Sequence, residues 1–303
     1  MILYLLYRIG YFLVQALPLK VSYILARSIA DIYYCWTVKD KRAVLENLKV
    51  ITGGRLSAVE LNKMGRDVFR NFAKYLADFF RSSKIDSNYV KRFIGIEGLE
   101  NLKSAMSKGK GVILLSAHIA NWELGAVVLG ILGYNISVVV LTHQNKKINA
   151  FFTRQRVLGN VKPIEIGIAL RSCYKVLGEN GLLGLLGDRD FSKTGIKTLM
   201  FGKPAIIPKG PAVFSYRLGS IIVPTFMIRK PDEAFRFIFD PPIEPAEILE
   251  SKTGDEEAGI QALTKAYIGI IESYIKQYPT QWFMFKEFWS GGDKESLRPD
   301  TII

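Results

Sequence analysis

The chain is poor in cysteine and histidine, the residue types that most often form cross-links or carry acid–base chemistry. Its 303 residues include two cysteines, Cys35 and Cys173, and two histidines, His118 and His143. Two cysteines far apart in the sequence form neither a disulfide framework nor a metal-binding spacing, and we expect both to be thiols in the apolar core. With two histidines, the chain has few side chains suited to general base catalysis near neutral pH.

Long uncharged hydrophobic runs are also missing, although the N-terminal segment 1–38 is strongly apolar. Its longest run without a charged residue extends only from Ile9 to Leu19, well short of the roughly 20 residues needed to span a bilayer. The segment lacks a small-residue cleavage site, so a removable signal peptide is not expected. Arg8 and Lys20 instead predict two helices, separated at Pro18, that lie in a membrane interface; the alternative is a buried helical hairpin.

Acidic residues are fewer than basic ones. Asp and Glu number 28 against 41 Lys and Arg, which gives a formal net charge of +13 and a pI near 9.6. This balance favours an anionic partner such as nucleic acid, an anionic membrane surface or an acidic carrier protein. The sequence has no zinc-finger spacing, RNA-binding aromatic signature or basic-region helix. Together with a hydrophobic fraction of 49% and a mean hydropathy of +0.15, this favours the membrane surface over nucleic acid.

Buried strands alternate with amphipathic helices along the chain. This alternation predicts an α/β fold with a central, mostly parallel sheet flanked by helices. We expect a membrane-associating helical segment over 1–50, a single α/β domain over 51–290 and a polar tail over 291–303. We expect the strand at 234–239 to lie at the edge of the sheet.

A long amphipathic helix is predicted at 56–81 by apolar residues at helical spacing. Its other face is basic and is expected to face solvent. That face carries Lys63, Arg66, Arg70 and Lys74.

The segment Gly111–Gly125 has the pattern of a buried strand, a sharp exit at His118 and a helix that begins after Asn121. Asn121 is a suitable N-cap, and Glu123 in the first helical turn complements the helix dipole. The Glu123 carboxylate can fold back onto one imidazole nitrogen, which would fix the tautomer and leave the other nitrogen as a general base. The alternative is a polar pair without catalytic function.

A second charged cluster follows the predicted strand Leu182–Leu186. Asp188, Arg189 and Asp190 follow this strand after Gly187, and α/β proteins bind ligands outside the carboxyl ends of their strands. We therefore expect this cluster to face the same crevice as His118.

Three further residues are candidates for the same region of the protein. Lys209 lies where Pro208–Pro211 opens a helix, whose free N–H groups and lysine could hold an anion. Arg156, in a helix predicted over 147–158, is a candidate anion contact. His143 ends a strand and is expected to be a turn residue, with a position in the pocket as the alternative.

Four stretches resemble the lauroyl/myristoyl-type bacterial lipid A biosynthesis acyltransferases, a family of the glycerolipid acyltransferase superfamily. Ser116–Glu123 resembles the family's histidine-four-residues-acid motif. Gly187–Asp190 resembles its Asp-Gln-Asp segment, Leu199–Pro204 its Phe-Phe-Gly turn, and Pro279–Trp282 its Pro-Glu-Gln-Trp. The chain departs from the family at 165–168, where a Gly-Arg-Asn segment is usual, and after Trp282.

The resemblance implies an O-acyltransferase at the cytoplasmic face of a bacterial inner membrane. It would move a fatty acyl chain from acyl carrier protein or acyl-CoA to a hydroxyl of a glycolipid such as a lipid A precursor. His118 would be the base and Glu123 its orienting partner, and no metal or cofactor is implied. Arg189 or backbone N–H groups would stabilise the oxyanion. The residues expected to contact substrate are Asn121, Arg156, Asp188, Arg189 and Lys209.

Two alternatives remain open at this stage. One is acyl transfer to another acceptor, such as a phosphatidylinositol mannoside or a lysophospholipid. The other is a non-catalytic lipid-binding protein with the same fold. Hydrolysis is not favoured, because the sequence has no Gly-x-Ser-x-Gly elbow to supply a serine nucleophile.

Overall fold

A seven-stranded sheet forms the centre of the computed structural model, which describes residues 2–166, 169–191, 194–249 and 255–289. Its strand order is β1-β9-β8-β2-β5-β3-β4, and every pair is parallel except β8 with β9. The strands are β1 Ile94–Glu97, β2 Val112–Ser116, β3 Ile136–Val140, β4 Val161–Glu165, β5 Leu182–Leu186, β8 Ile221–Arg229 and β9 Phe235–Phe239. The predicted α/β fold is confirmed, and the predicted tail 291–303 lies outside the described residues.

The sheet differs from the prediction at two of its strands. β9 is an interior strand, because it pairs with a strand along each of its edges. The short strand β1 pairs with it in parallel, with Ile94 opposite Phe235, and β8 pairs with its other edge in antiparallel orientation. β4 was not predicted. It contains Pro163 between Lys162 and Glu165, a pattern that suits an edge strand but gives a weak strand signal.

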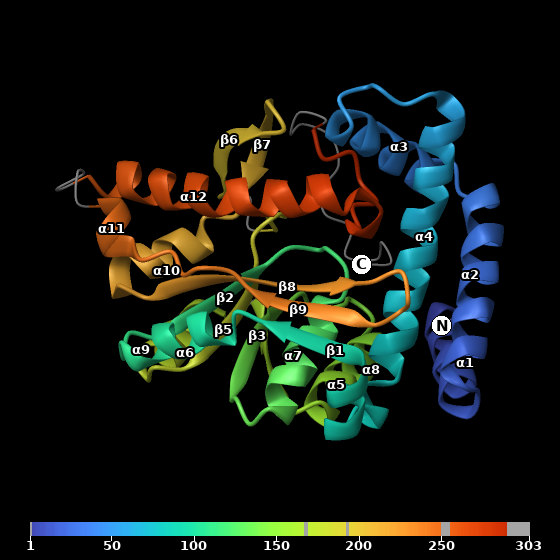
Figure 1. Cartoon of the computed structure of the whole chain (residues 1–303), viewed down its shortest axis with the longest axis horizontal. Coiled ribbons are helices and arrows are strands. Elements are labelled where there is room, and N and C mark those ends of the chain that lie inside the picture. The colour runs from blue at the N-terminus through green and yellow to red at the C-terminus, as the bar shows by residue number, and fades with distance from the viewer. Residues whose placement is uncertain (1, 167–168, 192–193, 250–254, 290–303) are drawn as a thin grey trace.

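A separate antiparallel hairpin lies beside the central sheet. It consists of β6 Ile196–Met200 and β7 Lys203–Ile207. Figure 1 shows the hairpin projecting beyond helix α12.

Twelve α-helices surround the sheet in the described ranges (Figure 1). They are α1 Ile2–Ala16, α2 Leu19–Trp36, α3 Lys39–Ile51, α4 Ala58–Phe80, α5 Ser87–Phe93, α6 Leu99–Ser107, α7 Trp122–Ile131, α8 Lys146–Leu158, α9 Ala169–Gly178, α10 Gly210–Leu218, α11 Pro245–Leu249 and α12 Glu256–Gln277. Several begin at a capping side chain. Ser57 and Glu60 form a reciprocal capping box on α4, and Asp255 caps α12.

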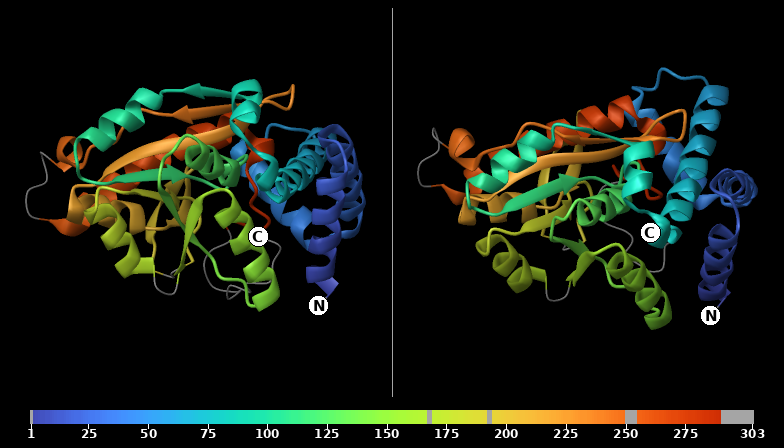
Figure 2. Two further views of the ribbon diagram at one scale, coloured as in Figure 1. Left: turned by 90° about the horizontal axis from the view of Figure 1, so that it is seen from below. Right: turned by 60° about the horizontal axis from the view of Figure 1, so that its bottom comes forward.

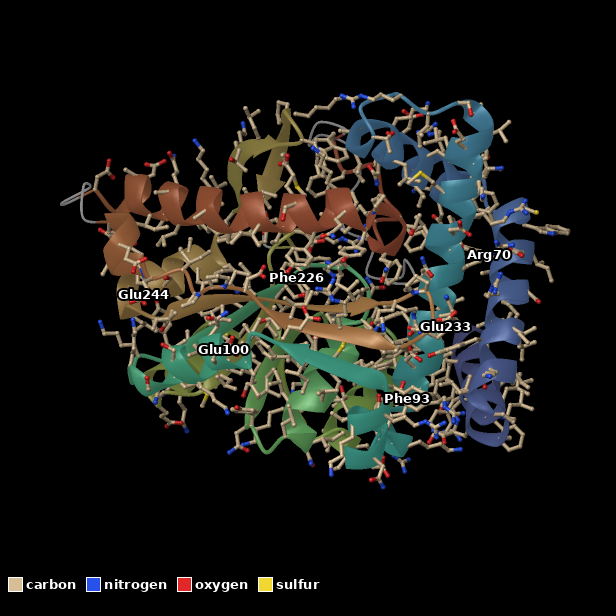
Figure 3. The ribbon with its side chains drawn as sticks, viewed as in Figure 1. Arg70, Phe93, Glu100, Phe226, Glu233 and Glu244 are labelled. Carbon is tan, nitrogen blue, oxygen red and sulfur yellow. The ribbon has the colours of Figure 1, made fainter. Side chains whose placement is uncertain are left out.

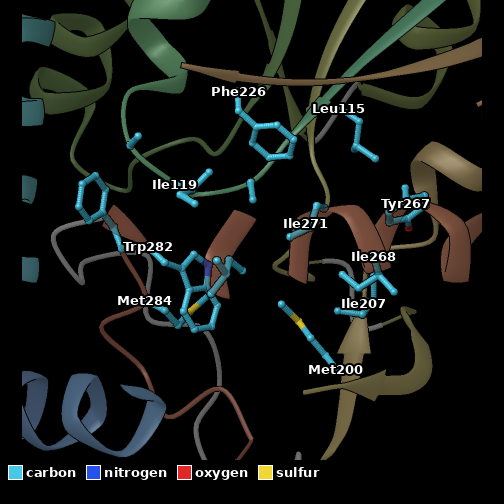
Figure 4. Close-up of a cluster of buried hydrophobic side chains, with 14 of the residues drawn as sticks. Leu115, Ile119, Met200, Ile207, Phe226, Tyr267, Ile268, Ile271, Trp282 and Met284 are labelled. Carbon is cyan, nitrogen blue, oxygen red and sulfur yellow. The ribbon is translucent and has the colours of Figure 1, made fainter. Parts of the chain in front are cut away.

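The two faces of the sheet bury different helices. Successive residues of a strand point to opposite faces, so Leu115 of β2 packs in the cluster with α9, α10 and α12, whereas Leu114 packs in the cluster with α6 and α7. Figure 4 shows Leu115 and Phe226 of the sheet facing Tyr267 and Ile271 of α12. β2 is therefore covered on both sides, and it holds the residues that follow it on a rigid base.

Helices α1 and α2 lie outside α4 at one end of the molecule, and all views agree on this (Figures 1 and 2). They separate at Pro18, as predicted. Arg70 of α4 lies between the helices (Figure 3) and donates from Nε to Asp31 Oδ1 of α2 at 2.7 Å. Within the described ranges, none of the helices combines the length and the apolar character that crossing a membrane requires.

Two predictions about exposure were wrong. Lys74 is buried, because α4 turns it toward the β8–β9 connection, where its Nζ lies 2.9 Å from Glu233 Oε1. Figure 3 labels Glu233 on this connection. Cys35 is exposed on α2, whereas Cys173 on α9 is buried as predicted. Burial raises the pKa of the Cys173 thiol to about 11.

Candidate active site

The candidate site is built on the turn between β2 and α7. Ala120 has a left-handed backbone, with φ 54°, and its N–H donates to Gln281 O at 2.7 Å. The Phe283 N–H donates to His118 O at 2.8 Å. Ile119 and Trp282 form an isolated antiparallel β-bridge. The turn is thus fastened by the segment that follows α12. This fixes the position of the histidine at its centre.

His118 is held by Asp188. The imidazole Nδ1 lies 2.8 Å from Asp188 Oδ1, and the His118 backbone N–H donates to Oδ2 at 3.0 Å. Trp282 Nε1–H also donates to Oδ2, at 2.8 Å. Burial alone would raise the pKa of Asp188, but the charge of His118 and these hydrogen bonds outweigh it and lower that pKa. Within the described residues Nε2 has no hydrogen-bond partner, and His118 lines a cavity.

Sheet register explains why Asp188 reaches the imidazole. Ser116 at the end of β2 lies opposite Leu186 at the end of β5. His118 and Asp188 each lie two residues beyond this pair, so parallel strands bring them side by side. The predicted convergence of the two strand ends on one crevice is confirmed.

The predicted contact between Glu123 and the imidazole is not formed. Glu123 instead accepts from Arg156 of α8, with Nη2 to Oε1 at 2.5 Å and Nε to Oε2 at 3.1 Å. Burial would lower the pKa of Arg156, but the Glu123 carboxylate outweighs it and raises that pKa. The correction has a simple geometric reason. α7 points Glu123 toward α8, while the neighbouring strand delivers Asp188 to the histidine.

A cavity of about 510 Å³ opens beside these groups. His118, Glu123 and Arg156 line it together with Arg189 and Lys209. Its walls are mostly apolar and come from both sides of the sheet ends. They include Ala126, Leu129 and Val138 on the α7 side and Leu170, Val213 and Phe214 on the α9 and α10 side. Such a space suits an elongated apolar ligand with its polar end at the histidine.

Besides Arg156, two further cationic side chains of the cavity were predicted from the sequence. Arg189 stacks over Phe191, with its Cζ 5.1 Å from the ring centroid, and burial lowers the pKa of its guanidinium. Within the described residues it forms no ion pair with a carboxylate. Lys209 is exposed where α10 begins. His143 also lines the cavity, so its alternative placement is the one observed.

Asn121 is used within the protein. Its Oδ1 accepts from the Leu124 N–H at 3.1 Å, which confirms the predicted N-cap, and its Nδ2 donates to Asp78 Oδ2 at 2.9 Å. Asn121 is 1% exposed and is not part of the cavity wall. Asp188, expected to contact substrate, is likewise fully buried behind His118.

Sequence reasoning missed the residues that support the turn from outside the motif. Asp78 and Arg229 form a buried ion pair beside Asn121, and Tyr75 stacks on Trp122 with ring centroids 4.5 Å apart. No local spacing connects these residues, because they come from α4 and β8. The part of the chain that the structure describes contains no group of three or more His, Cys, Asp or Glu side chains arranged to hold a metal.

Comparison with known proteins gives a consistent result. The family model for bacterial lipid A biosynthesis acyltransferases matches residues 1–290. A phosphatidylinositol mannoside acyltransferase of Mycobacterium tuberculosis (strain H37Rv) is 25% identical over 234 residues, 75% of this chain and 71% of the relative. The lipid A biosynthesis palmitoleoyltransferase of Escherichia coli (strain K12) is 25% identical over 241 residues, again 75% of this chain and 71% of the relative.

Proposed function

This chain belongs to the bacterial lipid A biosynthesis acyltransferase family, and we propose that it transfers a fatty acyl group from a thioester donor to a hydroxyl of a glycolipid. The donor would be acyl carrier protein or acyl-CoA. One observation carries the proposal: an imidazole held by a buried carboxylate through Nδ1 stands at the wall of a mostly apolar cavity.

In the proposed reaction, His118 Nε2 takes the proton of the acceptor hydroxyl as its oxygen attacks the thioester carbonyl. Asp188 stabilises the imidazolium that forms. When the tetrahedral intermediate collapses, the C–S bond breaks and the leaving thiolate takes the proton from Nε2. The acceptor is itself the nucleophile, so the protein forms no covalent intermediate.

The negative charge on the tetrahedral oxygen is stabilised by a hydrogen-bond donor or a cation placed beside it. Arg189 lines the cavity and, within the described residues, has no carboxylate bound to it. We assign the oxyanion to this guanidinium, whose low-dielectric surroundings strengthen the interaction. Glu123 and Arg156 neutralise each other, so their proposed part is to shape the polar end of the cavity.

The acceptor has two main candidates. Relatives named for lipid A biosynthesis and for phosphatidylinositol mannoside acylation are equally similar to this chain, at 25% identity each. We place a lipid A precursor first because the family model is named for that pathway. A phosphatidylinositol mannoside is the second candidate, because mycobacterial relatives of this chain are named as phosphatidylinositol mannoside acyltransferases.

We further propose that α1 and α2 dock on the cytoplasmic face of a bacterial inner membrane. Their outer surface exposes large apolar side chains, which we call the α1–α2 apolar surface. Its members are Leu5, Leu6, Ile9, Phe12, Ile24, Ile29, Ile32 and Trp36, each more than half exposed. Arg8, Lys20 and Arg27 on the same helices suit anionic headgroups.

The test is acyl transfer with purified protein. Acyl carrier protein thioesters of several chain lengths are incubated with a lipid A precursor, a phosphatidylinositol mannoside or a lysophospholipid, and the products are identified by mass spectrometry. We expect one acceptor to gain an acyl chain. His118→Ala should abolish transfer while vesicle binding is retained.

Two results would contradict the proposal. Full activity of His118→Ala would remove the base assignment. Binding of acyl donor or acceptor without any acylated product would favour a lipid-binding protein instead.

A further inference from the structure

One helix, α4, touches the catalytic motif at three successive points. Tyr75 stacks on Trp122 at an interplanar angle of 27°. Asp78 accepts from Asn121, and the Phe79 ring lies 5.6 Å from the Arg156 guanidinium carbon. Through these contacts α4 reaches Trp122, the first residue of α7, Asn121 just before it, and Arg156, the partner of Glu123.

Asp78 has the most demanding position of the three. It is 3% exposed, and its carboxylate receives hydrogen bonds from three elements: Asn121 before α7, Arg229 of β8 and Tyr23 of α2. Arg229 Nη1 also donates to the Tyr23 hydroxyl at 3.0 Å and to Glu233 Oε2 at 3.1 Å. A buried charge is tolerated only when it is paired in this way.

The hydrogen bond to Asp78 fixes the orientation of the Asn121 amide. With Nδ2 directed at the carboxylate, Oδ1 must face the Leu124 N–H, and this is the bond that starts α7. If the amide rotates, the first turn of α7 loses its cap, and Trp122 and Glu123 move with it. Trp122 in turn lies edge-on to the His118 ring, with centroids 5.1 Å apart.

Tyr23 brings the outer helix into the same network. It is one of the buried residues of α2, 5% exposed, and it lies next to Ile24, which is 64% exposed on the α1–α2 apolar surface. A single phenol hydroxyl therefore connects the helix proposed to dock on the membrane with the carboxylate that holds the catalytic turn.

We propose that Asp78 is a positioning residue for acyl transfer and that Tyr23 makes this positioning depend on α2. The inference rests on the proposed function for its kinetic readout. Asp78 is not part of the cavity wall; it acts through Asn121 on the start of α7.

The experiment compares Tyr23→Phe and Asp78→Asn with Arg70→Gln. Arg70→Gln is the matched control, because it removes a different α2–α4 contact, the ion pair with Asp31, without touching Asn121. We expect kcat to fall about 10-fold in Tyr23→Phe and up to about 100-fold in Asp78→Asn, the range that small misplacements of catalytic groups produce. KM for donor and acceptor should stay within about 2-fold, and Arg70→Gln should keep the wild-type kcat.

A second readout is independent of activity. Hydrogen exchange at the Leu124 amide, which the Asn121 cap protects, should be faster in both network variants and unchanged in Arg70→Gln. If Asp78→Asn fails to fold, Tyr23→Phe alone decides, because it removes one hydroxyl.

The inference is overturned if Tyr23→Phe keeps wild-type kcat and wild-type Leu124 exchange. It is also overturned if Arg70→Gln loses as much kcat, since the loss would then reflect helix packing in general. A wild-type protein without acyl transfer would contradict the proposed function, while the exchange at Leu124 would still test the positioning.

Discussion

His118 and Asp188 are neighbours because two parallel strands are in register. Ser116 pairs with Leu186 at the ends of the two strands, and the functional side chain lies two residues beyond each strand end. The 2.8 Å contact between Nδ1 and Oδ1 follows from that alignment, and Trp282 holds the second carboxylate oxygen. Orientation of the imidazole is thus a property of the sheet.

Replacement of Asp188 by Asn should lower kcat strongly. The amide cannot stabilise the imidazolium, and it permits the wrong tautomer, so we expect a loss of about 10²- to 10⁴-fold. Steady-state kinetics with an acyl carrier protein thioester measure this. Asp232→Asn, at an exposed site on the β8–β9 connection, is the control and should behave as wild type. Wild-type turnover in Asp188→Asn would rule out its assigned role.

The difference in unfolding free energy between Asp188→Asn and wild type should become smaller in acid. The pKa of Asp188 is below its ordinary 3.8 in the folded protein, so folding favours the carboxylate. The contribution is therefore complete above pH 3.8 and disappears as the pH falls through the lowered value. Urea unfolding from pH 7 to pH 3 should show a gap of about 1–3 kcal/mol that narrows in acid. A gap that widens in acid would contradict the shift.

Glu123 and Arg156 should behave as a coupled pair. Removal of one partner leaves a buried charge unpaired, so Glu123→Gln or Arg156→Met alone should each cost about 3–5 kcal/mol of unfolding free energy. The double variant should recover a large part of that loss, and a double-mutant cycle on urea unfolding measures the coupling. Additive losses would show that the pair is not coupled.

Charge on the α1–α2 apolar surface should weaken membrane binding. Ile24 and Ile32 are each 64% exposed, so replacement of both by Asp should leave the fold intact. We expect binding to anionic vesicles to fall by at least about 10-fold, because each inserted apolar side chain contributes about 1.5–3 kcal/mol. Leu199→Asp, 63% exposed on the distant β6–β7 hairpin, is the matched control in flotation assays (Figure 1). Equal losses in both would place the membrane contact elsewhere.

Gly111 should tolerate no side chain at the start of β2. Its φ is +70°, and a Cβ would lie 2.4 Å from Leu177 O. Gly109 has the same φ of +70° but nothing within 4 Å. Gly109→Ala should therefore lower the unfolding free energy by only about 1–2 kcal/mol, the cost of a left-handed backbone at a residue with a Cβ. Gly111→Ala should lower it clearly more, because the clash with Leu177 adds to this cost. Chemical denaturation of both variants separates clash from backbone strain, and equal costs would mean that α9 can move away.

Local signals in the sequence predicted the elements closest to the site. The β2 strand, the Asn121 cap and the β5 strand were found because apolar runs and capping residues act over a few residues. Interactions between distant elements were not found. The interior position of β9 depends on β1, and the partner of Glu123 comes from α8, so neither leaves a pattern along the chain.

The sequence by itself determined the α/β alternation, the position of His118 at a strand end and the family, since these depend on periodicity, caps and short motifs. Only the tertiary structure decided which carboxylate holds the imidazole. Glu123 is near His118 along the chain, but α7 directs it to Arg156, while the register of β2 with β5 brings Asp188 across. Side-chain pairing follows distance in space, and the parallel sheet sets that distance.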